Sequence, residues 1–264
     1  MSYNFNGKVV IITGSSSGIG QAAAILFAKS GASVTLHGRS EDGIKKTTDL
    51  ILEAGIPRER IHSVRGAVND SEVQKALIDE TIKKFGRIDI LINNAGGMKD
   101  DEKNPRSMVS LDYCLDVNLK APIALTELAI PHLEKTKGNI VNVSSVASIK
   151  PHPIAPFYGI AKAGLDHFAR NYAAILAPSG IRINNLNPGA TDTAIFTRSG
   201  IPPENVEKVK QMFTDLIPLN RWGTAEEMAE FLAFIASDKA AYMTGQMVNV
   251  DGGICIHSPS MKFD

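Results

Sequence analysis

Short apolar, mostly β-branched runs alternate along the chain with longer amphipathic segments. Such runs are typical of strands buried on both faces of a parallel sheet, and the segments between them have the period of helices. Strands are predicted at 9–12, 33–37, 61–64, 88–92, 139–143, 181–185 and 247–250. Helices are predicted at 20–29, 43–54, 72–85, 111–134, 158–176 and 225–236. This order predicts an α/β fold with a doubly wound, seven-stranded parallel sheet flanked by helices on both faces.

No linker divides the chain, so residues 1–264 are expected to form a single domain. The one long stretch without a clear period is 189–223, which is rich in Pro, Thr and Gly and carries several apolar residues. A long irregular stretch in a compact domain is usually functional, and this one is predicted to be a loop that covers the substrate.

The charge balance gives no reason to expect a nucleic acid or a membrane as partner, because Lys plus Arg and Asp plus Glu both count 28. The two cysteines, Cys114 and Cys255, have no metal-binding spacing; both are expected to be buried thiols, and no metal is expected. The polar first residues do not resemble a signal peptide, which makes the cytoplasm the expected location.

A glycine-rich loop follows the first predicted strand and reads Thr-Gly-Ser-Ser-Ser-Gly-Ile-Gly from residue 13 to residue 20. Its glycines permit a tight turn and close approach of a ligand, and the helix that follows offers unpaired N–H groups to a pyrophosphate. A turn that merely happens to be glycine-rich is the alternative. The position of the glycine-rich loop at the first strand-to-helix junction favours a Rossmann-type dinucleotide site. The expected contacts are Gly14, Ser15, Ser16, Ser17, Gly18 and Gly20.

Further motifs recur in order along the whole chain, and together they resemble the short-chain dehydrogenase/reductase family. They are the glycine loop, Asn93-Asn94-Ala95-Gly96, Asn118, Ser145, Tyr158 with Lys162, Pro188-Gly189 and Asp251-Gly252-Gly253. The resemblance implies an oxidoreductase that transfers a hydride between a nicotinamide cofactor and a carbonyl or secondary alcohol, and a small molecule as the partner.

Tyr158 and Lys162 are four residues apart on a predicted helix, so their side chains share one face. An ammonium beside a phenol favours the phenolate, and Tyr158 is expected to titrate nearer neutrality and to act as general acid and base. Ser145 precedes Tyr158 by 13 residues, which is the family's usual interval, and is preferred to Ser144 as the group that hydrogen-bonds the substrate oxygen. The resemblance also assigns Asn118 to a water-mediated proton relay, and gives Lys162 a second contact with the nicotinamide ribose.

The residues after the second predicted strand favour NADP over NAD. An NAD-selective fold usually places an acid there, whereas this chain has Gly38 followed by Arg39, which suits a 2′-phosphate. Hydroxyl groups of Ser15, Ser16 and Ser40 are further candidates for that phosphate. An arginine that is only solvated is the alternative for Arg39.

The resemblance extends the expected cofactor site to loops after other strands. The residues it implies are Ile19, Val68, Asn94, Ala95, Gly96, Tyr158, Lys162, Pro188, Gly189, Thr191 and Thr193. One position departs from the family pattern, because Ala67 stands where an Asp usually contacts the adenine amine.

The segments expected to wall the substrate pocket are mostly apolar. They supply Val146, Ile154, Phe157, Ile195 and Phe196, which predicts a lipophilic ketone or alcohol rather than a sugar or carboxylate. The family also commonly pairs two of its helices between subunits, and the apolar 158–176 segment is consistent with a homotetramer. The alternatives are an NAD-dependent alcohol dehydrogenase of the same family, and a dinucleotide-binding regulatory protein without turnover.

Overall fold

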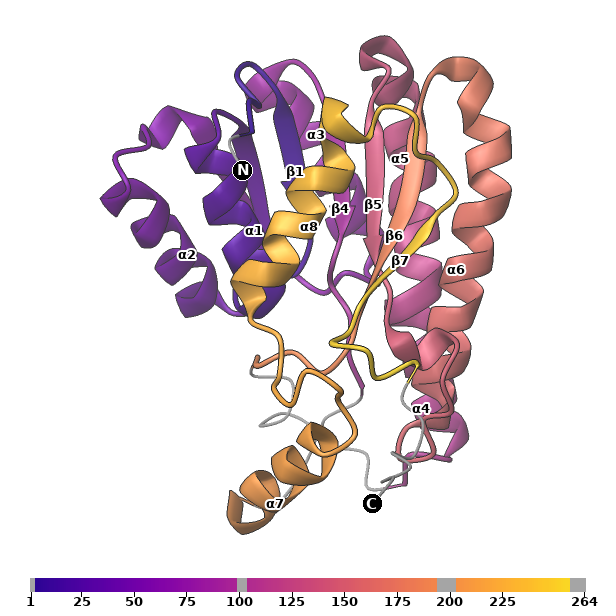
Figure 1. The fold of residues 1–264 in the computed structure, drawn as a ribbon. Helices are drawn as coiled ribbons and strands as arrows, with labels where there is room; N and C mark the ends of the chain where they lie inside the picture. The colour runs from indigo at the N-terminus through magenta and orange to yellow at the C-terminus, as the bar shows by residue number, and fades with distance from the viewer. Residues whose placement is uncertain (1–2, 99–103, 194–202, 257–264) are drawn as a thin grey trace.

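A computed structural model describes residues 3–98, 104–193 and 203–256 and contains one seven-stranded sheet (Figure 1). The strands are β1 (Val9–Ile12), β2 (Ser33–Gly38), β3 (Ile61–Arg65), β4 (Ile90–Asn93), β5 (Asn139–Val143), β6 (Arg182–Pro188) and β7 (Met247–Val250). Their order in the sheet is β3-β2-β1-β4-β5-β6-β7, and each neighbouring pair is parallel. The predicted fold class is confirmed.

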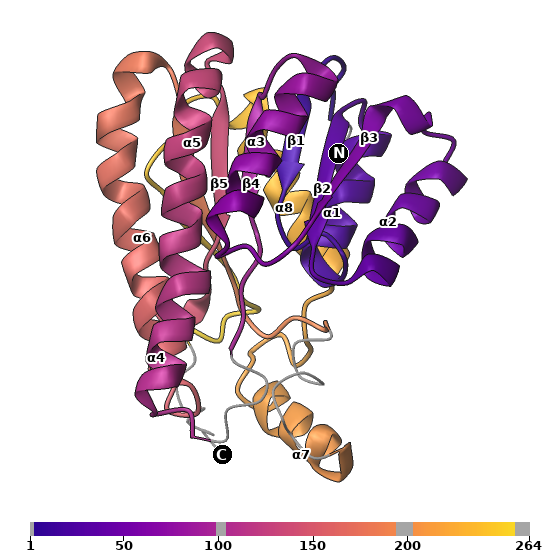
Figure 2. The same cartoon turned by 180° about the vertical axis from the view of Figure 1, so that it is seen from behind.

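Helices cover both faces of this sheet, as Figures 1 and 2 show from opposite sides. They are α1 (Gly18–Lys29), α2 (Glu41–Glu53), α3 (Ser71–Phe85), α4 (Met108–Leu115), α5 (Ala121–Thr136), α6 (Pro156–Leu176), α7 (Pro203–Thr214) and α8 (Ala225–Ala236). Short helical turns occur at Arg58–Arg60, Val146–Ser148, Ala177–Ser179 and Asp238–Ala240, and a π-helical turn at Asp116–Lys120. Helices α1 and α8 cover one face, and α3, α5 and α6 the other.

Two apolar cores form between the sheet and these helical layers. The first contains Ile12, Phe27 and Leu232, and the second contains Leu91 and Leu165. All five side chains are completely buried, which explains why the central strands read as continuous apolar runs. The rigid sheet between the cores fixes the loops at the carboxyl ends of its strands.

Beyond shifts at element ends, such as β6 running to Pro188, two predicted elements differ in the structure. The stretch 189–223 is not wholly irregular, because it contains the amphipathic helix α7, whose Lys210 carbonyl and Thr214 hydroxyl accept hydrogen bonds from the Trp222 indole N–H. The predicted helix 111–134 is two helices, α4 and α5, separated by the π-helical turn. Such turns are rare and often occur at functional sites.

The expectation of two buried thiols is only half right. Cys114 on α4 is buried, whereas Cys255, after β7, is partly exposed. Within the described ranges, no His, Cys, Asp or Glu side chains gather into a possible metal site. No described helix is both long enough and apolar enough to span a membrane.

Candidate active site

The glycine-rich loop joins β1 to α1 and leaves the first turn of α1 open to an anion. Gly14 and Gly18 have φ values of 66° and 57°, a region that glycine adopts without strain. No side-chain hydrogen bond from Ser17 caps α1, and its first turn contains no acidic residue. The N–H groups and the positive end of the helix dipole therefore suit a pyrophosphate, so the loop fits a dinucleotide.

Thr13 and Asn94 hold this loop against the end of β4. The Thr13 hydroxyl oxygen accepts hydrogen bonds from the backbone N–H groups of Asn94 and Ala95 at 3.0 and 2.9 Å. In return, the Asn94 Nδ2 donates to the carbonyl oxygens of Thr13 and Gly14 at 2.8 and 3.2 Å. Asn94 therefore shapes the predicted cofactor loop through its side chain, and Thr13 is a residue that sequence reasoning missed.

The close contact between these loops explains two of the glycines. A Cβ on Gly14 would lie 2.9 Å from the Ala95 Cα, and one on Gly20 would lie 2.4 Å from the Asn94 Nδ2. Real Cβ atoms do not approach so closely, so these positions exclude a side chain even without a ligand. Close packing within the protein therefore requires glycine at both positions, and the predicted approach of a ligand stays a prediction.

Ser15 holds the loop to β2, and its predicted role as a phosphate ligand stays a prediction. Its backbone N–H donates to the His37 carbonyl at 2.8 Å, and its hydroxyl oxygen accepts from the His37 N–H at 2.9 Å. The His37 Nδ1 in turn accepts a hydrogen bond from the Gly14 N–H at 3.2 Å. Burial lowers the pKa of His37 to about 4, so the neutral imidazole needed for this bond prevails at neutral pH.

The predicted 2′-phosphate region combines a glycine, a serine and an exposed arginine. A Cβ on Gly38 would lie 2.7 Å from Ser16 Oγ and 2.8 Å from Ser16 Cβ, so Ser16 fills the space of a side chain at position 38. Arg39 is exposed, and the Ser40 hydroxyl caps α2 by accepting from the Gly43 N–H at 3.1 Å. The nearby Glu41 carboxylate forms an ion pair with Arg65 at 2.7 Å.

Ser145, Tyr158 and Lys162 lie together where β5 and α6 meet. The Lys162 Nζ donates to the Val143 carbonyl at 2.8 Å and lies 5.5 Å from the centre of the Tyr158 ring. Ser145 hydrogen-bonds with Tyr158. The Ser144 hydroxyl instead donates to the Lys162 carbonyl at 3.3 Å, so the structure places Ser145 beside the tyrosine and Ser144 against the helix backbone.

The ionisation of this group differs from the expected phenolate. Burial raises the pKa of Tyr158 to about 12, although its bond with Ser145 acts in the opposite direction. Burial also lowers the pKa of Lys162 to about 8, opposed by the charge of Asp166. The expectation that Lys162 brings the pKa of Tyr158 nearer neutrality is wrong, because the desolvation of the phenolate dominates.

The Asn118 side chain is fully engaged with backbone groups. Its Oδ1 accepts from the Gly97 N–H at 2.9 Å, and its Nδ2 donates to the carbonyls of Gly97 and Cys114 at 2.8 and 3.0 Å. It thereby fixes the loop after β4, beside Gly96, where an added Cβ would lie 3.2 Å from the Lys162 Nζ. Its predicted place in a proton relay stays a prediction.

The loop after β6 closes on the glycine loop. A Cβ on Gly18 would lie 3.3 Å from the Thr193 Cβ, and the Thr191 hydroxyl donates to the Gly189 carbonyl at 3.1 Å. Gly189 itself leaves no room for a side chain, since its Cβ would lie 2.7 Å from the Asp251 Cα. The predicted residues after Pro188 thus lie beside the predicted phosphate loop.

Two other predicted positions have different surroundings. Val68 belongs to the second apolar core, and its predicted contact with the cofactor stays a prediction. Ile19 is partly exposed in the first turn of α1.

The substrate side is described only in part. Val146 and Phe157 are partly buried near Ser145 and Tyr158, whereas Ile154 is 64% exposed. Ile195 and Phe196 lie outside the described residues. His152 has its ring centre 6.3 Å from that of Tyr158, and burial lowers its pKa. A neutral imidazole therefore stands close to the tyrosine.

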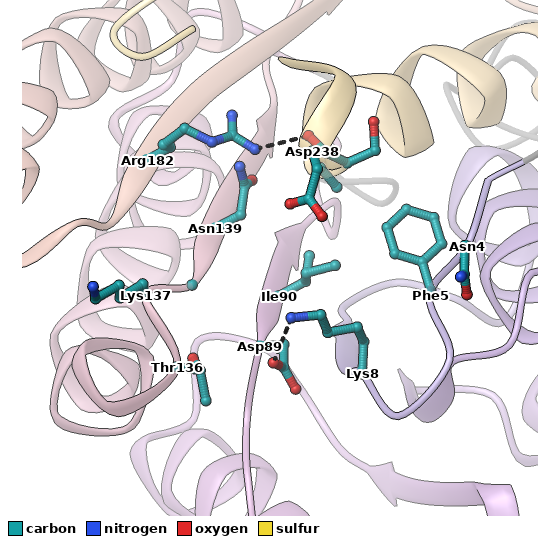
Figure 3. A pocket seen from close by; sticks show the side chains of 13 residues that line it. Asn4, Phe5, Lys8, Asp89, Ile90, Thr136, Lys137, Asn139, Arg182 and Asp238 are labelled. Carbon is teal, nitrogen blue, oxygen red and sulfur yellow. Dashed lines mark hydrogen bonds and ion pairs between the residues drawn. The ribbon is translucent and has the colours of Figure 1, made fainter. Parts of the chain in front are cut away.

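A small polar pocket at the opposite edge of the sheet is separate from this site (Figure 3). It lies at the amino ends of the strands and is lined by Lys8, Asp89, Asn139, Arg182 and Asp238, among others. The Lys8 Nζ is 3.4 Å from Asp89, and Arg182 donates to the Ser237 carbonyl at 3.1 Å. These contacts hold Lys8, Asp89 and Arg182 within the fold.

The parallel sheet, with the glycine loop at the end of β1, defines a dinucleotide-binding α/β protein, and Ser145, Tyr158 and Lys162 lie together near the end of β5. Comparison with known proteins agrees with this class. A family model described as enoyl-(acyl carrier protein) reductase matches residues 14–255. The chain belongs to the short-chain dehydrogenase/reductase family.

Three relatives illustrate the range of the family. The 3-oxoacyl-(acyl-carrier-protein) reductase FabG of Thermotoga maritima is 36% identical over 95% of this chain and 98% of its own. The 3beta-hydroxysteroid dehydrogenase 1 of Eggerthella lenta is 35% identical over 98% of both chains. The crystal structure of glucose dehydrogenase of Caenorhabditis elegans is 39% identical, with a TM-score of 0.84 and coverage of 96% and 99%. This chain is thus an oxidoreductase of CH–OH groups that uses a nicotinamide dinucleotide, NAD or NADP.

Proposed function

We propose that the protein is an NADP(H)-dependent oxidoreductase that interconverts a lipophilic ketone and its secondary alcohol. The observation that carries the proposal is the group of Ser145, Tyr158 and Lys162 beside the glycine loop at one edge of the sheet. A bound nicotinamide supplies or accepts the hydride in this reaction. The residues of the chain hold the substrate oxygen and move its proton.

The high pKa of Tyr158 suits the reduction of a carbonyl. A phenol with a pKa of about 12 is protonated at neutral pH and can donate its O–H proton to the oxygen on which negative charge develops. The Ser145 hydroxyl, already bonded to Tyr158, can hydrogen-bond the same oxygen. The Lys162 ammonium lies 5.5 Å from the tyrosine ring and stabilises the phenolate left after proton transfer.

Selectivity for NADP is supported by Gly38, Ser16 and Arg39. Ser16 takes the space that a side chain at position 38 would need, so the acid that repels a 2′-phosphate is excluded by packing. Arg39 is exposed at the adjacent position, and a guanidinium suits bidentate binding of a phosphate. Neither Ser16 nor Arg39 would favour the ribose hydroxyl of NAD over that phosphate.

An apolar substrate is supported by the walls that the structure describes. The segment after Ser145 and the turn after β7 form a hollow lined by Ile149, Lys150, Pro151, Ile254 and Cys255. The Lys150 Nζ donates to the Ile254 carbonyl at 2.9 Å, which removes it as a free partner for a carboxylate. Relatives named for a steroid and for a 3-oxoacyl chain fit such walls, whereas the relative named for glucose does not.

A homotetramer is proposed from the face of α6 that its own subunit leaves uncovered. Most apolar residues of α6 pack into the second core, but Ile160 and Ile175 remain 55% and 62% exposed. Met108 and Val109 on α4 are also exposed, at 65% and 52%. Burying these side chains between subunits would remove apolar surface from water. The expected location remains the cytoplasm.

Oxidation of NADPH with a panel of ketones tests the proposal, compared with NADH and with sugars and keto acids. Tyr158→Phe should abolish turnover but preserve NADPH binding, because only the proton donor is lost. Tyr242→Phe is the matched control, since Tyr242 is fully exposed and should behave as wild type. Binding of NADPH without turnover of any carbonyl would instead favour a regulatory protein, and equal efficiency with both cofactors would refute the NADP assignment.

A further inference from the structure

A chain of buried polar side chains crosses the sheet beneath the candidate active site. Asn93, Asn142 and Asn185 are register partners on β4, β5 and β6, and each amide donates to the next side chain. The Asn93 Nδ2 donates to the Asn142 Oδ1 at 2.9 Å, and the Asn142 Nδ2 donates to the Asn185 Oδ1 at 2.8 Å. The Asn185 Nδ2 then donates to the Asp166 Oδ1 at 2.8 Å. The chain of amides thus ends on a carboxylate.

Asp166 receives a second hydrogen bond that leads back to the serine loop. The Asn187 Nδ2 donates to the Asp166 Oδ2 at 2.8 Å and also to the Ser148 hydroxyl oxygen at 3.1 Å. Ser148 closes the helical turn Val146–Ser148, and its N–H donates to the Ser145 carbonyl at 3.0 Å. Asp166 is therefore two hydrogen-bonded side chains away from the residue that contacts Tyr158.

Asp166 is unusual among the acidic residues of the chain. It is 3% exposed, and among the residues that the structure describes only Asp89 is an equally buried acid. Asp89 forms ion pairs with Arg87 and Lys8, at 2.7 and 3.4 Å. For Asp166 no ion pair within 4 Å occurs in the described ranges. Its charge is therefore stabilised by amide N–H groups and by electrostatic attraction to a cation at longer range.

The cation that this field reaches is Lys162. The two residues are four apart on α6, which places their side chains on the same face one turn apart. Both are buried, so water screens the interaction little. Asp166 is also the largest influence that opposes the effect of burial on the pKa of Lys162.

We propose that Asp166 is a positioning residue of the active site, which keeps Lys162 charged and, through Asn187 and Ser148, fixes the loop that carries Ser145. The proposal rests on the proposed function only for its catalytic consequence. Its electrostatic part concerns the chain alone.

Other charged or titratable groups around Lys162 leave Asp166 as its principal counter-charge. Cys114 on α4 and Tyr158 on α6 face Lys162, and both are neutral at pH 7, because burial raises both pKa values. On the adjoining π-helical turn, Asp116 pairs with Lys120 at 2.8 Å. Asp112 on α4 is exposed, and its charge raises the pKa of Lys120.

The test uses the complete protein and two kinds of variant. Asp166→Ser removes the charge and leaves one hydroxyl oxygen as an acceptor, whereas Asp166→Asn would set one amide N–H against another. Asn187→Ala keeps the charge and breaks the link to Ser148. Asp166→Glu restores the charge as the conservative control, and thermal melting checks that each variant is folded.

The first readout needs no substrate or cofactor. In protein labelled with ¹³C at lysine Cε, the Lys162 resonance, identified with Lys162→Met, should titrate near its pKa of about 8 in the wild type. Loss of a nearby opposite charge should lower that pKa by about one unit or more in Asp166→Ser. Asp166→Glu should restore it, and Asn187→Ala should change it little. An unchanged Lys162 titration in folded Asp166→Ser overturns the proposal.

The second readout is the pH dependence of kcat with NADPH and a ketone. Lys162 loses its positive charge as the pH rises. The alkaline limb of the profile should therefore move to lower pH in Asp166→Ser. Asn187→Ala should lower kcat several-fold without moving that limb, since only the serine loop is loosened. A kcat equal to that of the wild type in Asn187→Ala would overturn the proposal that Asp166 fixes the Ser145 loop through Asn187 and Ser148. A wild type without turnover would refute the proposed function, while the lysine titration would still decide the charge of Lys162.

Discussion

Replacing Gly38 by Asp is the obvious change to convert the protein from NADP to NAD, and the structure predicts that it fails alone. The new Cβ would lie 2.7 Å from the Ser16 Oγ and 2.8 Å from the Ser16 Cβ. Rotation about χ1 moves the Oγ away but leaves the Cβ in place.

The loss of stability in Gly38→Asp can be worked out from the contact between the new side chain and the Ser16 Cβ. Because the Ser16 Cβ cannot rotate away, the backbone of the glycine loop must shift, and overpacking of this kind costs about 1–3 kcal/mol. For a chain of this size each kcal/mol lowers Tm by about 2–4 °C, so Gly38→Asp should melt about 2–12 °C below the wild type. Activity should fall with both cofactors, since the same loop is expected to bind the pyrophosphate.

The double variant Ser16→Gly/Gly38→Asp removes both obstructing atoms and should recover most of the lost stability. It should also prefer NADH, because the carboxylate repels a 2′-phosphate and accepts from a ribose hydroxyl. Ser16→Ala/Gly38→Asp is the matched control, as it removes the Oγ but keeps the Cβ. Thermal melting of the wild type, Ser16→Gly, Gly38→Asp and Ser16→Gly/Gly38→Asp would measure the coupling, expected at about 1–2 kcal/mol. Measurement of kcat/KM with both cofactors would give the cofactor preference. The reasoning would be refuted if alanine at position 16 restored Tm as well as glycine does, or if Gly38→Asp melted at the same temperature as the wild type.

Three further predictions concern stability, ionisation and assembly. His37 is protonated near pH 6.5 in the unfolded chain but only near pH 4 in the folded protein. The contribution of neutral His37 to the free energy of unfolding should therefore be fully present above pH 6.5, and should fall by roughly 3 kcal/mol towards pH 4. Urea unfolding should show that this part of the acid sensitivity is absent in His37→Asn, and an unchanged pH dependence would contradict it. Tyr158 should remain unionised up to about pH 11 in the cofactor-free protein, which ultraviolet difference titration against Tyr158→Phe can measure; ionisation near pH 8 would be contrary to the structure. Light scattering should give a tetramer mass, reduced in Ile160→Lys/Ile175→Lys but not in the exposed control Tyr242→Lys, and a wild-type monomer would exclude the proposed assembly.

The hydrophobic pattern was sufficient to predict the sheet because burial on both faces leaves a local signature. β1 and β4 are short runs in which every residue is buried, and both stand out in the sequence without knowledge of their neighbours. The ends of helices were less predictable where a capping side chain determines the first helical residue. The helix predicted from residue 43 begins at Glu41, because the Ser40 side chain accepts from the Gly43 N–H. The helix α7 was missed because its Pro- and Thr-rich surroundings hid a short amphipathic period.

The sequence also determined which chemical groups the protein contains and placed the main ones correctly in order. The glycine loop, Ser145, Tyr158 and Lys162 follow local spacings that a single chain displays, and the fold brings them to one edge of the sheet. Only the tertiary structure decided how those groups ionise, since desolvation depends on neighbours distant in the sequence. It also gave structural roles to Thr13, His37 and Asp166, whose partners lie 19 to 82 residues away and leave no periodic trace.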